Sequence, residues 1–418
     1  MMPKTFVVPV LMCAIAACGG DDKKERGELH LASIVPKTGT FATLYPLANS
    51  AVAFSAQTIN EAGGVLGNDL VFDEYDEASG TNGVQPITDV ANTLVDNGTQ
   101  VWIGPWLSDT AIAAAPIAGA NQRLMITPIA GAAALSSVND DDFAFRGLES
   151  PYISAIGAAA AAYDAGARTA AALHLNFATG NEQSEIFLST FAAKGGTMTV
   201  NHAYTFDSTN PGTFNAQAQL DAVFASDPDV IFLYAAAADA VALLTTWNKA
   251  DWDGRLTVGV ILGTPELAAA VGAAKMNGVY AYGAVPADPT QQAVVVDAFT
   301  AFSGTTVTGA NVNLLNSIVN TVYMAALAIE KAGEYDGTKA RDALRLIANG
   351  PGEQVTGAVE FARALEIVRD GGDLDFEGLT AEIEYDENGD FPSNLAERRF
   401  NASGQLDTLR VMESGVDF

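Results

Sequence analysis

Short apolar strand patterns alternate with helix patterns along most of this 418-residue chain, and this alternation constrains the fold more than any other feature. Strands that alternate with helices favour a parallel sheet, because each crossover helix returns the chain to the same edge. One such run covers residues 29–127, and a second begins near Pro151. Roughly 400 residues exceed what a single hydrophobic core holds. The sequence therefore predicts an α/β fold with two doubly wound parallel-sheet lobes.

The loops at the carboxyl ends of the expected strands form the candidate ligand site. Ligands of open parallel sheets bind beyond these strand ends. The expected strands occupy residues 29–35, 70–75, 101–103, 124–127, 169–175, 197–204, 230–234 and 256–262. The helices between them are expected at 47–61, 84–97, 109–121, 154–165, 181–193, 215–226 and 238–249. The candidate loops are therefore 36–45, 104–108, 127–133, 176–180, 234–239 and 262–266.

The N-terminal segment has the features of an export signal. Lys4 precedes an apolar run at 6–17 that is shorter than the roughly 20 residues a bilayer-spanning helix needs. The sequence Ile-Ala-Ala before Cys18 resembles the lipobox of bacterial lipoproteins, in which the cysteine carries a diacylglycerol. We expect a signal peptide at 1–17, lipidation of Cys18 and a polar tether over 18–28. The alternative is an ordinary signal peptide. Either places the protein in the bacterial cell envelope, on its periplasmic or extracellular face.

Charge and residue content exclude several classes of function. The formal net charge of −29 repels phosphate backbones, so nucleic acid is not an expected partner. No cysteine follows Cys18, which excludes a thiol nucleophile or a cysteine metal site downstream. The histidines at 30, 174 and 202 lack metal-ligand spacing, and Ser108 lacks a sharp G-x-S-x-G turn. We expect no catalytic residue, metal or cofactor, and hence a binding protein.

An ordered series of motifs resembles the leucine/isoleucine/valine-type periplasmic binding proteins. The segment INEAGGVLG at 59–67 is one of these motifs. The others lie at 38–39, 75–76, 103–108, 126–128, 227–230, 277–280, 328–333, 372–378 and 385–390. The resemblance implies two lobes joined by a three-strand hinge that closes on a ligand, and an ABC permease in the inner membrane as partner. We expect lobe I at 29–148 and 284–352, and lobe II at 149–283 and 353–418.

The resemblance implies a ligand-binding site that this chain keeps only in part in lobe I. Ser108 matches the serine behind the ligand carboxylate, whereas the threonine of the following loop is replaced by Gly131. The aromatic residue of the first loop falls at Leu44, beside Tyr45, and Phe41 lies in the same loop. The remaining ligand-contacting residues expected in this lobe are Trp106, Ile129 and Ala130.

Lobe II departs further from the implied pattern. The expected tyrosine falls near Ala236, two residues from Tyr234, and the acid that neutralises an ammonium falls at Leu262. Phe177 adds an aromatic side chain, and Asp239 or Glu266 could supply a displaced anion. A buried ammonium without a carboxylate is costly. We therefore expect a solute-binding protein of an ABC importer whose small-molecule ligand is more apolar than a free amino acid. The alternatives are a sensor subunit for a membrane receptor and a hydrolase that uses Ser108.

Overall fold

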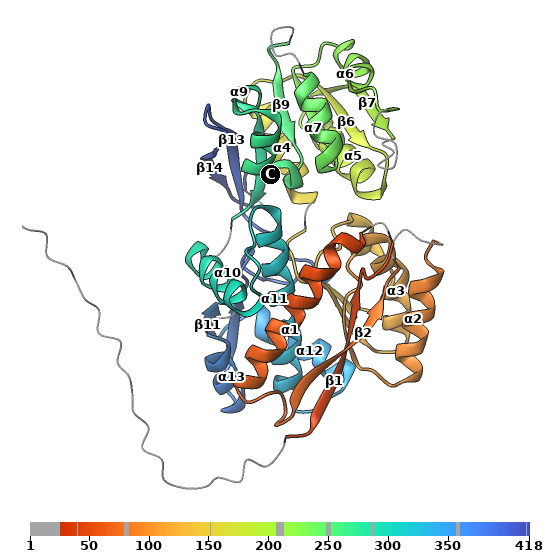
Figure 1. The fold of residues 1–418 in the computed structure, drawn as a ribbon, viewed down its shortest axis with the longest axis vertical. Helices are drawn as coiled ribbons and strands as arrows, with labels where there is room; N and C mark the ends of the chain where they lie inside the picture. Colours follow the sequence, from red (N-terminus) through yellow and green to blue (C-terminus); the bar gives the residue numbers. More distant parts are fainter. Residues whose placement is uncertain are drawn as a thin grey trace, which may run out of the picture.

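The computed structural model describes residues 26–39, 41–78, 83–150, 152–205, 213–247, 252–285, 288–356, 360–414 and 416–418. Within them the chain forms two α/β lobes, which lie one above the other in Figure 1. The predicted signal peptide, Cys18 and most of the tether lie outside the described residues. The predicted fold, two doubly wound lobes joined at a hinge, is confirmed.

The described part of lobe I is built on a five-stranded parallel sheet with the order β2-β1-β3-β4-β5. Its strands are β1 (Glu28–Val35), β2 (Asp69–Asp76), β3 (Val101–Ile103), β4 (Leu124–Thr127) and β5 (Ala144–Arg146). Its helices are α1 (Tyr45–Glu61), α2 (Gln85–Asp96), α3 (Ser108–Ala120), α10 (Pro289–Ser303), α11 (Ala310–Ala332) and α12 (Gly337–Ala348). Side chains of β1 alternate between two cores: Leu31 packs in the core with α1 and α11, and Ala32 in the core with α2 and α3. Helices therefore cover both faces of the sheet.

Helix α11 is the central core helix of lobe I. Its side chains from Leu315 to Ile329 are buried, apolar and polar alike. Among the described residues, α11 is the one helix long and apolar enough to cross a membrane, and 83% of its apolar window is buried inside the protein. Burial in the lobe I core accounts for its apolar composition.

The described part of lobe II contains a seven-stranded sheet with the order β14-β13-β10-β9-β8-β6-β7. Its strands are β6 (Thr169–Leu175), β7 (Thr197–Tyr204), β8 (Val230–Tyr234), β9 (Arg255–Val258), β10 (Tyr280–Ala284), β13 (Leu395–Phe400) and β14 (Leu406–Met412). Helices α4 (Tyr152–Asp164) and α5 (Ala178–Ala193) pack on one face. The other face is covered by α6 (Ala216–Phe224), α7 (Ala237–Thr246), α8 (Pro265–Val271) and α9 (Ala273–Met276). The pairs β10–β13 and β13–β14 are antiparallel, and the other pairs of this sheet are parallel.

The sequence predicts that the segment after residue 352 belongs to lobe II, whereas the first part of this segment packs against lobe I. A small parallel sheet of β11 (Glu353–Thr356) and β12 (Leu374–Glu377), with α13 (Phe361–Arg369), lies against lobe I, at the lower left of Figure 1. Val355, Phe361 and Phe376 are fully buried in the same core as α11 and α12. The cause is the apolar face of α13, which the core of lobe I covers. From this segment, the chain returns to lobe II only at β13.

The described chain passes between the lobes through three connections: at residues 147–150, which run from β5 towards α4, at Val285 after β10, and at residues 378–394, which run from β12 to β13. The first and third lie side by side, because the Ser150 N–H donates to the carbonyl of Phe391. The second and third are also paired, since the Val285 N–H donates to the carbonyl of Asn394 at 2.9 Å. The hinge is therefore a hydrogen-bonded bundle of three segments.

Candidate ligand-binding site

The lobes meet at the carboxyl ends of their parallel strands. Glu182 on α5 reaches across to lobe I, where its Oε1 accepts a hydrogen bond of 3.0 Å from the N–H of Ala134 in the short 3-10 helix η2 (Ala133–Ser137). Helix α3 of lobe I contacts α5 of lobe II. The helices α3, α5, α7 and α8 all begin after such strands. Their first N–H groups have no partner within the helix and favour anionic or polar oxygens. The region between these helix ends is the candidate site.

Ser108 and Gly131 form the polar side of the site in lobe I. Ser108 is the first residue of α3, and its Oγ accepts from the N–H of Ala132 at 3.1 Å. Its own hydroxyl hydrogen therefore remains available to a ligand oxygen. Within the described chain, the N–H of the buried Gly131 has no acceptor, whereas the N–H of Ala130 donates to Thr127 Oγ1 at 3.2 Å. Ser108 and Gly131 together offer two adjacent donors.

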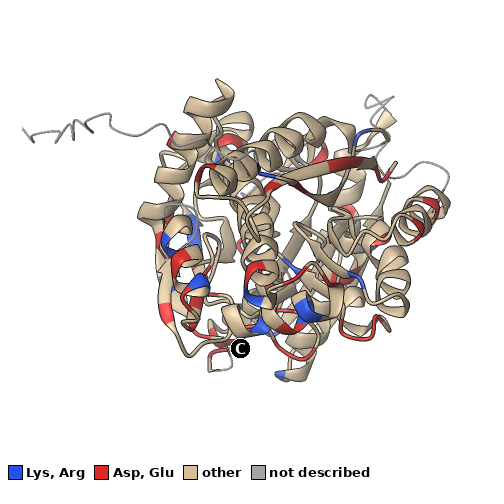
Figure 2. Cartoon of the chain, turned by 90° about the horizontal axis from the view of Figure 1, so that it is seen from below, with Lys and Arg blue, Asp and Glu red and all other residues tan. Residues whose placement is uncertain are grey.

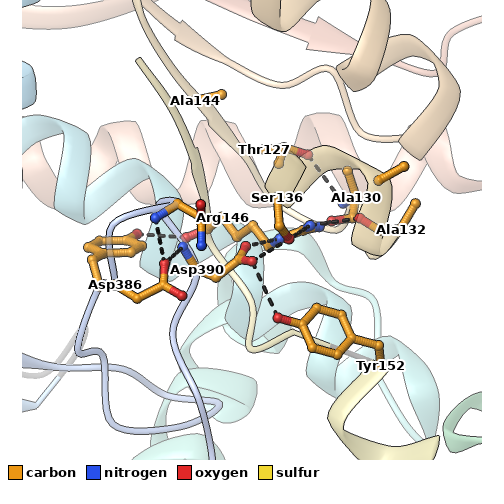
Figure 3. A network of polar contacts seen from close by, with 12 residues as sticks. Thr127, Ala130, Ala132, Ser136, Ala144, Arg146, Tyr152, Asp386 and Asp390 are labelled. Atoms are coloured by element: carbon orange, nitrogen blue, oxygen red, sulfur yellow. Dashed lines mark hydrogen bonds and ion pairs between the residues drawn. The ribbon is translucent and has the colours of Figure 1, made fainter. Parts of the chain in front are cut away.

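A buried arginine holds this loop in place. Arg146 ends β5 and is 1% exposed. Its guanidinium donates to the carbonyls of Ala130 and Ala132 and to Ser136 Oγ, and it pairs with Asp390 of the third connection (Figure 3). The guanidinium is thus occupied by the loop and by Asp390, and it is not available to a ligand in the site. Sequence reasoning missed this residue, although a charged residue at the end of a buried apolar strand is a signal for a paired side chain.

Glu77 occupies the space behind the start of α3. Its Oε2 accepts from the N–H groups of Trp106, at 2.9 Å, and Leu107, at 3.3 Å, and from Thr110 Oγ1, at 2.7 Å. Burial raises the pKa of Glu77 to about 7, although these hydrogen bonds act in the opposite direction. Trp106 is fully buried in the lobe I core, so it supports the site from behind rather than lining it.

The other predicted lobe I residues lie around the first loop and the 129–132 loop. Ile129 is half-buried against the lobe I core and Ala130 is buried. Leu44 and Tyr45 are half-buried at the start of α1, and the Tyr45 hydroxyl donates to Glu74 at 2.9 Å. Tyr45 is therefore held by β2, while Phe41, 39% exposed, remains the accessible aromatic side chain of this loop.

Lobe II contributes an aromatic pair. Phe177 immediately precedes α5, and its ring centroid lies 5.9 Å from that of Tyr234 at the end of β8. Burial, and then the charge of Glu182, raise the pKa of Tyr234, and Glu182 lies on α5, the helix that Phe177 precedes. Since Glu182 also contacts Ala134, the aromatic pair lies beside the loop that carries Gly131. The Glu182–Ala134 contact thus joins the helix that Phe177 precedes to the segment that follows Gly131.

The remaining lobe II predictions are not all accessible. Ala236 is exposed at the start of α7. Leu262 is 1% exposed in the lobe II core, whereas its neighbour Ile261 is 45% exposed. Asp239 is fully buried and accepts from the Tyr204 hydroxyl, and burial raises its pKa. Neither Leu262 nor Asp239 therefore presents its side chain to the site.

Glu266 lies at a second approach of the two lobes. A Cβ on Gly309, the residue before α11, would lie 2.8 Å from Glu266 Oε2. This carboxylate thus lies at the positive N-terminal end of α11 rather than in the candidate site.

Several buried polar atoms near the hinge lack a protein partner in the described residues. They include Glu149 Oε2 and Ser150 Oγ of the first connection, Gln183 and Ser184 of α5, and both amide atoms of Asn316 on α11. A buried polar atom without a partner costs about 1–3 kcal/mol. Glu149 keeps one hydrogen bond, from Thr380, and burial raises its pKa to about 7. These atoms are positioned to take water or ligand as partners.

Comparisons with known proteins agree with this arrangement. The sequence matches the family model described as "Periplasmic binding protein" over residues 28–364. No curated protein matches the sequence. The structure is similar to a leucine-binding protein of Thermotoga maritima, with a TM-score of 0.68 and 20% identity over 92% of this chain and 99% of that one. The family and these structural relatives are solute-binding proteins, not enzymes.

Two further relatives were solved with ligands. A substrate-binding protein from Streptococcus pneumoniae, in complex with isoleucine, has a TM-score of 0.67 and 15% identity over 92% of this chain and 99% of that one. A solute-binding protein from R. palustris, in complex with benzoate, has a TM-score of 0.67 and 17% identity over 94% of this chain and 99% of that one. The match over residues 28–364 covers most of the sequence, and the chain therefore belongs to the periplasmic binding protein family, with a fold of the leucine/isoleucine/valine type.

Proposed function

We propose that this protein captures an aromatic or aliphatic monocarboxylate between its lobes and delivers it to an ABC permease. The observation that carries the proposal is the pairing of two donors with an aromatic wall. Ser108 and Gly131 offer hydrogen bonds to a carboxylate or another polar oxygen. Phe177, half-buried before α5, offers apolar surface, and the buried ring of Tyr234 packs against it.

Two of the three acids near the site are unavailable to the ammonium of a free amino acid. An ammonium would need an unengaged carboxylate, and Asp239 is buried against Tyr204 while Glu266 lies at α11. Glu182 accepts a hydrogen bond from Ala134 through Oε1, and its buried Oε2, which has no partner among the described residues, is the carboxylate oxygen that an ammonium would compete for. Benzoate bound to one relative has the proposed chemistry, and isoleucine bound to another is the competing choice.

A thermal-shift panel tests this choice. Benzoate, 4-hydroxybenzoate, a medium-chain fatty acid, leucine and isoleucine are titrated against the purified chain. Binding to the folded state raises the melting temperature with ligand concentration. We expect the monocarboxylates to raise it, and Ser108→Ala to weaken the response about tenfold, with a lower melting temperature of the empty protein because the buried N–H of Ala132 loses its acceptor. A shift with leucine or isoleucine that exceeds every monocarboxylate would overturn the proposal.

We further propose that Cys18 carries a lipid anchor. The support is the signal-like segment and the lipobox-like residues before Cys18. Expression of the full chain in a bacterium, followed by membrane fractionation, tests this assignment. We expect Cys18→Ser to move the protein to the soluble fraction, and unchanged fractionation would refute it.

A further inference from the structure

A cavity that is separate from the candidate ligand site lies at the hinge. It has a volume of about 620 Å³, and none of the predicted ligand-contacting residues lines it. Its wall comes from Val285 of the second connection, several residues of the third, Gln354 of β11 and Ser414 after β14. Because β11 packs with lobe I and β14 pairs in lobe II, both lobes contribute to this cavity.

The wall of the hinge cavity is acidic. Glu377, Glu382 and Glu384 line it, and no described lysine, arginine or histidine does. The whole chain has 50 acidic and 21 basic residues, and in Figure 2 the acidic positions are spread over many helices and loops. A field of this sign attracts cations to an acidic recess.

One of these carboxylates is both buried and incompletely bonded. Glu377 is 8% exposed, and its Oε1 accepts from Gln354 Nε2 at 3.2 Å. In the described structure its Oε2 has no hydrogen-bond partner. Burial, together with the negative charges of Glu382, Asp375 and Glu384, raises the pKa of Glu377 to about 7. A cationic donor in the cavity would supply the missing hydrogen bond to Glu377 and would offset the repulsion between Glu377 and the neighbouring carboxylates.

A second unpartnered polar group lies in the same wall. Ser393 is 4% exposed, and its Oγ has no partner among the described residues. Its neighbour Asn394 links two other parts of the wall, because its Oδ1 accepts from the N–H of Ser414 at 3.2 Å and its carbonyl accepts from Val285. Two buried polar atoms of the cavity wall, Glu377 Oε2 and Ser393 Oγ, therefore lack a hydrogen-bond partner among the described residues.

The volume of the cavity and the arrangement of its acidic side chains indicate which kind of cation it binds. No group of three acidic, histidine or cysteine side chains in the described chain is arranged to hold a metal ion. The volume is in the range of sites for small organic molecules. We propose that the hinge cavity binds a small organic dication of the alkyl-diamine class, with one ammonium at Glu377 and the other at Glu382 and Glu384.

Calorimetric titration of the full chain with 1,4-diaminobutane tests the proposal. We expect one saturable site, weakened at least tenfold in Glu377→Gln and in the double variant E382Q/E384Q. Asp96→Asn is the matched control, because Asp96 is an exposed acid at the end of α2 in lobe I. It should bind the diamine as the parent chain does. Both residues of the double variant are exposed, so that variant still tests the site if Glu377→Gln does not fold.

The proposal fails if the diamine does not bind saturably or if both Glu variants bind it like the parent chain. It also fails if Asp96→Asn weakens binding equally, or if magnesium chloride displaces the diamine at equal concentration, since either result would indicate general charge screening. Thermal shifts with the monocarboxylate panel are measured on the same variants. We expect these shifts to be unchanged, so failure of the hinge site is separable from failure of the proposed function.

Discussion

The carboxylate of Glu182 in lobe II accepts a 3.0 Å hydrogen bond from the backbone N–H of Ala134 in lobe I. This contact crosses the boundary directly beside the candidate site. The chain between Glu182 and Ala134 passes through the first connection of the hinge, so the contact depends on the angle between the lobes. It links closure to the loop that carries Gly131.

Glu182→Ala is expected to weaken solute binding about tenfold. The lost hydrogen bond involves a charged acceptor and is worth about 1.5–3 kcal/mol, part of which stabilises only the closed form. Calorimetry with the solute that gives the largest thermal shift measures the change. Glu185→Ala is the control, since Glu185 is exposed on the same helix. Equal affinities in the two variants would show that the Glu182 contact does not stabilise closure.

Replacing Arg146 by Met is expected to destabilise the protein by about 3–5 kcal/mol, because Asp390 is then left as a buried, uncompensated charge. Denaturant unfolding monitored by circular dichroism gives the free energy. The double variant R146M/D390L should recover a large part of the loss, since it removes both charges. If the double variant is no more stable than Arg146→Met, the ion pair is not the source of the effect.

The buried carboxyl group of Glu149 is expected to make the stability of the protein depend on pH. Burial raises its pKa from 4.5 to about 7, so the folded state binds more protons than the unfolded state between these values. Stability from this group therefore falls as pH rises from about 4.5 to 7 and levels off above. Glu149→Gln should flatten this slope and, at pH 8, stabilise the protein relative to the parent chain by about 1–3 kcal/mol. Denaturant unfolding at pH 5, 6, 7 and 8 measures both effects, and parallel pH profiles for the two proteins would contradict the prediction.

Phe177→Ala is expected to weaken binding of an aromatic monocarboxylate at least tenfold, because an aromatic contact and its buried area are both lost. An aliphatic acid should be affected less. Tyr234→Phe keeps the ring and should leave the affinity within about threefold. Thermal shifts with benzoate and with the fatty acid check the prediction. If Phe177→Ala weakens the binding of benzoate no more than the binding of the fatty acid, the aromatic pair is not part of the site.

Much of the fold could be predicted because local pattern and long-range packing agree. Leu31 and Ala32 of β1 face different cores, which is what a strand covered on both faces requires. Helix α1 ends at Glu61 as expected and begins at Tyr45, two residues before the predicted start, because Pro46 in its first turn needs no N–H partner.

The errors arise where a side chain depends on distant partners. The short 3-10 helix Val260–Leu262 turns Leu262 into the core and leaves Ile261 exposed, and a three-residue element leaves no periodic signal. Arg146 and Asp390 are separated by 244 residues, and no local pattern connects them. The packing of Phe361 on lobe I depends likewise on a core formed by α11 and α12.

The Arg146–Asp390 pair makes the ligand loop part of the hinge. Asp390 lies on the third connection, and the same guanidinium holds the carbonyls of Ala130 and Ala132. A rotation of the lobes that moves this connection must therefore carry the loop with it. The exposed turn at Asp386, four residues before Asp390 on the same segment, is itself held to lobe I, because Arg345 of α12 donates to its carbonyl at 2.7 Å. The ligand loop and this exposed turn therefore belong to one unit, which moves as a whole when the lobes rotate.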